Sequence, residues 1–442
     1  MSFKGWIRRW QSRADLHRRK RDRKSQQALR EQILFQPMLA RLEDRRVLSV
    51  SVGVDAGVVT FQGEDGASDA LSLSASSGGC LQYSSDGGKT WTTDLDSGPS
   101  EVELLVHDIA RVRFFGGGGD DTLTVDFRQG SPIPVEGLLF DGGGDHDSLR
   151  IVGSGLHAIY SPNAVLPGSG LISLSGGAIS FADLEPIDYE VAGGTFTLNL
   201  PGGDDLVDIA DSTLTDGITP ALKISGSSGG VSFEDARVRG STIVIDTTAV
   251  AGADRITISS AAGSHANTSL RIATGVEAGD VVTVNGTATF SGTVTIDCPT
   301  VNLSAPITNR VAGTATTVNV ASPGRIQDGI DAAVNHGTIH VAAGNYSENL
   351  TINRDYLTVR STDGAASTII TPSDTTAGGV FIQGDYNTFE GFTVQDFTDD
   401  SRENKIIRIG IGSDYNTIQD NVLQGNLNQS GIADPTEYGV LC

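Results

Sequence analysis

Short runs in which apolar and polar residues alternate fill most of the chain after residue 50. Examples are GVVTF (57–61), DTLTVDF (121–127), TFTLNL (195–200) and DVVTVNG (280–286). Alternation with a period of two, between clusters of Gly, Asp, Ser and Asn, is typical of half-buried strands. Because no run in residues 50–310 keeps a helical period, the sequence predicts an almost entirely β region there.

The pattern changes near residue 324, where GRIQDGIDAAVNHG (324–337) places Ile326, Ile330, Ala333 and Val334 at helical spacing. Gly337 suits a helix stop. Strand-like runs follow, and the sequence Asp-Tyr-x-Thr recurs from residues 355, 385 and 414, at intervals of 30 and 29. The end of the chain is therefore predicted to be a helix followed by a repeat.

A repeat of this length with short strands is what a parallel β-helix requires, since each coil must stack one strand spacing, ~4.8 Å, from the last. Inward Ile, Val, Leu and Phe side chains would then form ladders. Asn387, Asn416 and Asn421 suit the turns between strands, where a left-handed backbone and stacked amide hydrogen bonds are both useful.

Residues 311–442 resemble the opening of the pectin lyase-like β-helix superfamily: a strand, a helix from Ile326 to Ala333, and the block from Thr338 to Ile352. This resemblance implies a right-handed parallel β-helix whose short helix closes the N-terminal end. It indicates a fold and not an activity. Because the chain ends at EYGVLC, as a strand begins, we expect the β-helix to be incomplete at residue 442.

A second cassette, Gly followed by Asp and an alternating strand, recurs in residues 50–310. Its aspartates are Asp69, Asp121, Asp147, Asp205 and Asp254, at intervals of 52, 26, 58 and 49. The self-similarity favours stacked β units. Either a β-solenoid or separate sandwich domains would fit this loose unit of about 26 residues.

The copy from Gly116 to Thr124 fits the calcium-binding nonapeptide G-G-x-G-x-D-x-U-x. Because carboxylates are hard oxygen ligands, Asp120, Asp121, Asp145 and Asp147 are candidate calcium ligands. The favoured alternative is a Gly-Asp turn that supplies a positive φ and a capping carboxylate. Nearby, SSDGGKTW (84–91) resembles the Asp-box of sialidases, which implies a structural hairpin and not a catalytic site.

Charge divides the chain into a basic leader and an acidic body. Residues 1–49 hold 14 of the 31 basic and 5 of the 54 acidic residues, a balance of +9, which leaves 17 basic and 49 acidic residues, or −32, in residues 50–442. Such a body would repel phosphate, so no nucleic-acid partner is expected for it. No apolar run is long enough for a transmembrane helix.

The leader, residues 1–49, is expected to be largely disordered or helical. Its basic run is a solvated tail, or else a patch for nucleic acid or anionic lipid. An ordinary signal peptide is not expected, because Ile33-Leu34-Phe35 is too short for an apolar core. Leu42 to Ser49 resemble the LEPR-XLL leader of exported planctomycete proteins, which implies export to the cell surface or beyond.

Residues 395–405 carry the densest polar cluster of the predicted β-helix, with Asp396, Asp399, Asp400, Arg402 and Lys405 as catalytic candidates. A solvated loop is the favoured interpretation. We therefore expect an exported surface protein with a structural or adhesive role that binds polysaccharide or other cell-envelope components. The alternatives are a pectate lyase-like or pectinesterase-like enzyme with an incomplete site, and a calcium-stabilised adhesive protein.

Overall fold

A computed structural model describes residues 50–96, 100–374, 378–395, 405–424 and 438–441. The predicted leader lies outside these ranges, so its expected character and its resemblance stay predictions. Residues Leu48–Cys442 form one compact unit. Among the described residues the elements are strands, apart from a 3-10 turn, η1 (Val106–Asp108), and one helix, α2 (Ile326–Ala332). The chain is thus nearly all β, as the sequence predicts.

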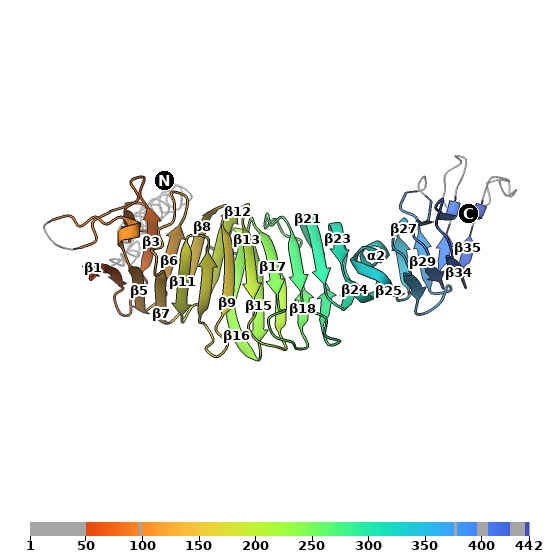
Figure 1. Cartoon of the computed structure of the whole chain (residues 1–442), viewed down its shortest axis with the longest axis horizontal. Helices are drawn as coiled ribbons and strands as arrows, with labels where there is room; N and C mark the ends of the chain where they lie inside the picture. The colour runs from red at the N-terminus through yellow and green to blue at the C-terminus, as the bar shows by residue number, and fades with distance from the viewer. Residues whose placement is uncertain (1–49, 97–99, 375–377, 396–404, 425–437, 442) are drawn as a thin grey trace, which may run out of the picture. The chain divides into compact units, whose positions relative to one another are not determined.

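The described strands form four sheets, called A to D below and given in spatial order (Figure 1). Sheet A contains β1 (Ser51–Asp55), β2 (Val58–Gln62), β5 (Arg111–Gly118), β7 (Leu138–Gly144), β11 (Gly177–Ala182), β10 (Gly170–Leu174), β9 (His157–Pro162), β13 (Thr195–Asn199), β17 (Thr242–Asp246), β19 (Leu270–Ala273), β21 (Ala288–Asp297) and β23 (Ile307–Gly313). Sheet B contains β4 (Leu81–Ser84), β3 (Ala70–Ala75), β6 (Thr122–Asp126), β8 (Ser148–Ser154), β12 (Ile187–Ala192), β16 (Val231–Arg239), β15 (Pro220–Ser228), β14 (Leu206–Thr213), β18 (Arg255–Ile258), β20 (Val281–Val284), β22 (Thr300–Leu303), β24 (Ala315–Val320), β25 (Ala333–Val341), β28 (Thr358–Ser361), β31 (Thr388–Glu390) and β34 (Thr417–Gln419). Sheet C contains β26 (Gly344–Ser347), β29 (Thr368–Thr371), β32 (Thr393–Gln395) and β35 (Val422–Gln424), and sheet D contains β27 (Leu350–Ile352), β30 (Val380–Ile382), β33 (Lys405–Ile409) and β36 (Tyr438–Leu441).

From β2 to β24 the chain alternates between sheets A and B, and most neighbouring strands pair in parallel. Thr122 of β6 lies opposite Ala70 of β3 on one side and Ser148 of β8 on the other. The intervals of 52 and 26 residues between successive aspartates are therefore both single coils. The longer one contains an excursion that includes β4 and η1. Residues 50–310 and 311–442 share sheet B, so the stacked units continue across that boundary.

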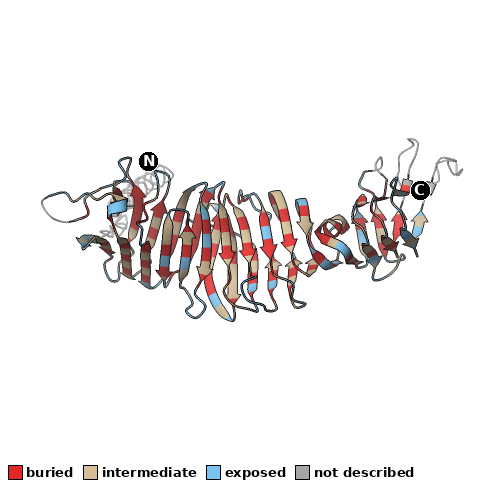
Figure 2. Ribbon diagram, viewed as in Figure 1, coloured by how far each residue is buried: buried red, intermediate tan, exposed pale blue. Residues whose placement is uncertain are grey.

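The two faces of each coil enclose the core, as the period-two pattern predicts. In β5, Val112 and Phe114 are buried and alternate with half-buried residues, and in β6 Leu123 and Val125 do the same. Figure 2 shows this alternation as red and paler bands along the strands. Phe114 stacks on Phe140 of the next coil, with ring centroids 5.1 Å apart. The apolar ladder therefore runs from coil to coil.

Two antiparallel meanders interrupt the parallel stack. β9, β10 and β11 form one in sheet A, and β14, β15 and β16 form the other in sheet B. Each meander adds two strands to its sheet, so both faces lengthen equally and the coils that follow remain paired. Bulky side chains fill the interior beside these insertions, where Tyr160 contacts Phe181, Phe196 and Phe233.

Beyond α2, the coils contribute to sheets B, C and D. Thr358, Thr388 and Thr417 lie opposite one another in β28, β31 and β34, so the 30- and 29-residue repeat is one coil, as predicted. The side chain of Asn387 accepts a hydrogen bond from Leu357 N, and that of Asn416 accepts one from Asn387 N, each at 2.8 Å. This confirms the predicted amide ladder.

The left-handed turn positions are tyrosines and not the asparagines that the sequence suggested. Tyr356, Tyr386 and Tyr415 have φ values of 58°, 57° and 56°. Their rings stack 4.6 and 4.7 Å apart, and His336 stacks on the first of them. A left-handed residue with a side chain costs roughly 1–2 kcal/mol, and ring stacking contributes about 0.5–1.5 kcal/mol per pair in return.

Helix α2 is shorter than predicted and lies inside the stack. It ends at Ala332, not near Gly337, because Ala333 already pairs with Ala315 as β25 joins sheet B. We expected a helix that closes the N-terminal end of a β-helix. Sheet B instead continues on both sides of α2, and the helix contacts β23, the last strand of sheet A, and β27, the first strand of sheet D.

Side chains of α2 and its surroundings satisfy backbone groups at this step. Asp328 accepts a hydrogen bond from Ile307 N of β23 at 2.9 Å. The side-chain amide of Gln327 accepts from Thr351 N and donates to Thr351 O, at 2.8 and 3.2 Å. Glu348 accepts from Ile326 N and Gln327 N, which are free donors at the start of the helix. The helix therefore replaces a strand between two sheets.

Replacing Gln327 with Met should destabilise the protein because both polar groups of Thr351 lose their partner. Leaving such groups unsatisfied costs about 1–3 kcal/mol. Urea unfolding should show this loss in Q327M and almost none in Q383M, which changes an exposed glutamine. Equal stability of the two variants would contradict the bridging role of Gln327.

The Gly-Asp cassette builds a column of buried carboxylates between coils. Asp69 N donates to Asp121, Asp121 N to Asp147, Asp205 N to Asp254, and Asp254 N to Asp280, over distances of 2.7 to 3.1 Å. These aspartates are at most 1% exposed. A Cβ on Gly116 or Gly142 would collide with the carboxylate of Asp121 or Asp147, respectively. The glycine in each cassette therefore makes room for the aspartate.

Burial raises the pKa of Asp121 to about 7 and the pKa values of Asp147 and Asp205 to about 6. In the unfolded chain these groups lose their protons near pH 4. Between those values the folded chain binds more protons, so its free energy of unfolding falls as the pH rises.

We therefore expect the melting temperature to fall between pH 5 and pH 7.5. In D147N, which keeps the amide oxygen as acceptor but cannot ionise, the fall should be smaller than in D120N, which changes an exposed aspartate. Thermal melts followed by circular dichroism would measure both. A wild-type melting temperature that rises over this range would contradict the interpretation.

Candidate functional site

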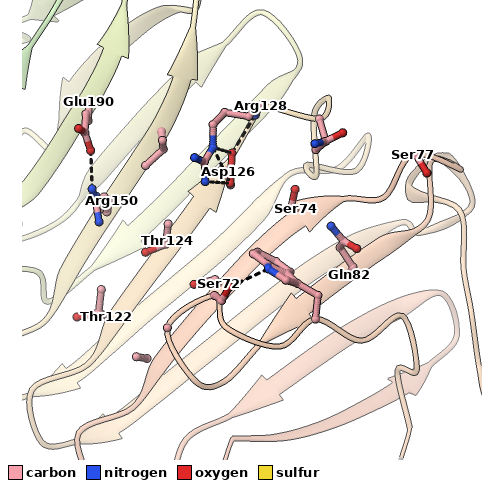
Figure 3. Close-up of a pocket in the computed structure, with 16 residues that line it drawn as sticks. Ser72, Ser74, Ser77, Gln82, Thr122, Thr124, Asp126, Arg128, Arg150 and Glu190 are labelled. Atoms are coloured by element: carbon pink, nitrogen blue, oxygen red, sulfur yellow. Dashed lines mark hydrogen bonds and ion pairs between the residues drawn. The ribbon is translucent and has the colours of Figure 1, made fainter.

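A groove of about 970 Å³ lies on the outer face of sheet B. Its residues come from five neighbouring strands, in the order β4, β3, β6, β8 and β12, and from the loops beside them. The lining residues are Ala70, Ser72, Ser74, Ser77, Gln82, Gly87, Gly88, Trp91, Thr122, Thr124, Asp126, Arg128, Gln129, Arg150, Val152 and Glu190. Figure 3 shows many of these side chains standing on adjacent strands.

The floor of the groove consists mainly of short polar side chains at outward positions of the strands. Ser72 lies opposite Thr124, and Ser74 lies opposite Asp126. Because outward residues of paired strands align, they form columns across the sheet at a spacing of ~4.8 Å. Thr124 is next to Arg150 in one column, and Asp126 is next to Val152 in the other. The floor therefore offers regularly spaced hydroxyl groups.

One wall is the turn that the sequence resemblance predicted as an Asp-box hairpin. Tyr83 and Thr92 pair through two backbone hydrogen bonds of 2.9 and 3.0 Å, which confirms the hairpin. Asp86 accepts hydrogen bonds from Lys89 N and Thr90 N, each at 2.9 Å, and from Ser84 Oγ at 2.7 Å. Bonds from Thr90 and Ser84 hold the pKa of Asp86 far below its ordinary value.

This turn fixes the one aromatic side chain of the groove. Trp91 Nε1 donates to Gly88 O at 3.1 Å, and the residue is 37% exposed. The indole is thus anchored through its polar atom while part of its surface remains open. An exposed, rigidly held aromatic ring beside rows of hydroxyl groups suits a ligand with both apolar and polar surfaces.

The other side of the groove carries two ion pairs, both drawn in Figure 3. Arg128 binds Asp126 through Nε and Nη2, with the shortest distance 2.6 Å, and Arg150 Nη2 lies 2.5 Å from Glu190. Burial alone would raise the pKa of Asp126, but hydrogen bonds from Arg128 outweigh it and lower that pKa. The same contact raises the pKa of Arg128.

These pairs are better suited to binding than to proton transfer. A general acid needs a carboxyl group that keeps its proton near neutral pH, and a general base needs a group that can release one. Asp126 is held ionised and Arg128 is held protonated, so neither meets this requirement. Arginine and carboxylate groups fixed in pairs can still donate to, and accept from, hydroxyl groups.

Of the catalytic candidates, Asp396, Asp399, Asp400 and Arg402 lie outside the described residues, and Lys405 begins β33. Their role stays a prediction. The calcium candidates are all described. Asp121 and Asp147 belong to the buried column, whereas Asp120 accepts from His146 N and Asp145 from Gly119 N.

The cassette aspartates act as capping acceptors, in line with the favoured Gly-Asp alternative. Asp145 also has the positive φ, 76°, that this alternative expects. Among the described residues there is no group of three or more His, Cys, Asp or Glu arranged to hold a metal ion. Calcium binding stays a prediction.

Sequence analysis missed the groove because its parts are far apart in the chain. Trp91 was interpreted only as part of a hairpin, and Arg128, Arg150 and Glu190 belong to three different coils. The available signal was the alternation of Ser or Thr at outward positions in ALSLS and DTLTVDF. That signal needs the coil register before it identifies one surface.

A comparison with protein-family models, curated proteins and solved structures found no match to this chain. In the described part of the chain, no helix is long and apolar enough to cross a membrane.

Removing Asp86 should loosen Trp91, because the turn loses the acceptor for its backbone donors. The three tryptophans are Trp6, Trp10 and Trp91, so W6F/W10F leaves a single indole. In that background D86A should increase acrylamide quenching of the fluorescence, whereas K89A, on the same turn, should not. Unchanged quenching in D86A would show that the turn does not depend on Asp86.

Proposed function

We propose that this protein is an exported surface protein that binds polysaccharide through the groove on sheet B. The observation that carries the proposal is the combination of Trp91, held on a fixed turn, with a floor of aligned hydroxyls and two ion pairs. Sugar rings present apolar faces and many hydroxyl groups, so this set of side chains matches their chemistry. A structural or adhesive role follows if the bound glycan belongs to a cell envelope or matrix.

Two features of the sequence support export. Leu42 to Ser49 resemble the LEPR-XLL leader, from which we propose a planctomycete source and a location at the cell surface or outside the cell. The opening of residues 311–442 resembles the pectin lyase-like superfamily, and we propose that these coils form a right-handed β-helix of that kind. The parallel sheets B, C and D and their repeat of about one coil support this assignment.

The groove is proposed to bind without cleaving. Glycoside hydrolysis uses two carboxyl groups, one of which must donate a proton. In the groove Asp126 and Glu190 are each paired with arginine. An adhesive protein requires only the binding contacts, which these pairs and the hydroxyl columns supply.

The full chain should be retained by one or more insoluble or gel-embedded glycans without releasing reducing ends or unsaturated uronates. Affinity electrophoresis measures retention, and sugar assays measure cleavage. W91A should migrate freely, whereas K89A should be retained like the wild type. Failure of every glycan to retain the wild type would contradict the proposal, and turnover of a retained glycan would favour the enzyme alternative.

A further inference from the structure

We infer that the ligand of this groove is an uncharged polysaccharide chain that lies across the strands of sheet B. The inference rests on the proposed function and adds the ligand class and its direction. Among the groove residues the charged side chains are Asp126, Arg128, Arg150 and Glu190. They form two opposite-charge pairs, so the lining has no net charge.

An anionic sugar would have to compete with a carboxylate that is already in place. Asp126 is 6% exposed and also accepts from Arg128 N at 2.9 Å. Withdrawing Arg128 toward a uronate or sulfate would leave a buried carboxylate without its cation, which is strongly unfavourable. The balance of −32 in residues 50–442 adds long-range repulsion of polyanions.

A neutral sugar avoids this competition. Arg128 uses Nε and Nη2 toward Asp126, and no hydrogen bond to protein occupies Nη1. A guanidinium has five N–H donors, so the intact pair can still donate to a sugar hydroxyl. Gln82, Gln129 and the floor hydroxyls both donate and accept, as neutral hydroxyl groups require.

The direction of the chain follows from the columns. One column runs through Ser72, Thr124 and Arg150, and the next runs through Gln82, Ser74, Asp126, Val152 and Glu190. A glycan that crosses the strands meets one member of each column at every strand, ~4.8 Å apart. Trp91 belongs to the turn that follows β4, and Glu190 lies on β12, so the two mark opposite ends of the groove.

Isothermal titration of the full chain with xylan or glucan oligosaccharides, polygalacturonate oligosaccharides and a sulfated galactan tests the ligand class. At least one neutral glycan should bind, with a Kd that hardly changes between low and high salt. The anionic glycans should bind at least about tenfold more weakly. W91A should weaken neutral binding at least about tenfold, while K89A should not.

A charge-releasing variant tests the pairing argument directly. In E190Q, Arg150 loses its carboxylate, so affinity for polygalacturonate should rise severalfold at low salt while neutral binding is largely kept. Circular dichroism checks that each variant is folded. If anionic glycans bind the wild type best, or if E190Q gains nothing, the inference is wrong although the proposed function stands. If no glycan of any class binds, the proposed function itself fails.

Discussion

Every coil of this protein depends on the next one to satisfy its backbone. In a parallel stack the strands pair between coils, so a coil by itself leaves unpaired N–H and C=O groups along both edges. The turns have the same difficulty, because their backbone donors do not face another strand. Here the side chain of the following coil accepts them: Asp121 and Asp147 do so in the first part of the stack, and Asn387 and Asn416 in the second.

This dependence explains how the architecture changes without leaving edges open. The meander in sheet A would put the two faces out of step, but the meander in sheet B adds the same number of strands. At α2 one sheet ends and two begin, and polar side chains take over from strand pairing. Gln327 acts toward Thr351 as a neighbouring strand would, since its amide offers both a donor and an acceptor. Each irregularity is thus matched by a local replacement for the lost hydrogen bonds.

The sequence alone was sufficient for the strands, the coil repeat near the end and the hairpin at Asp86, because these depend on local alternation and turn chemistry. It was insufficient where a contact between coils decides the outcome. The unit of 26 residues was obscured because excursions lengthen two coils to 52 and 49 residues. Ala333 has helical spacing but becomes a strand, since Ala315 needs a partner. The groove could not be foreseen, because Arg150 and Glu190 meet only when register is known.

The same reasoning locates the function in a departure from the repeat. Thr317, Thr338 and Thr358 form another hydroxyl column on sheet B, so rows of hydroxyls are a property of the stack and cannot select a ligand by themselves. Selection requires side chains that rise beside the row. The excursion between β3 and β5 supplies Trp91 on a turn stiffened by Asp86, and the segment after β6 supplies Arg128. Because such excursions lie outside the paired strands, they can vary without breaking the ladder on which the fold depends.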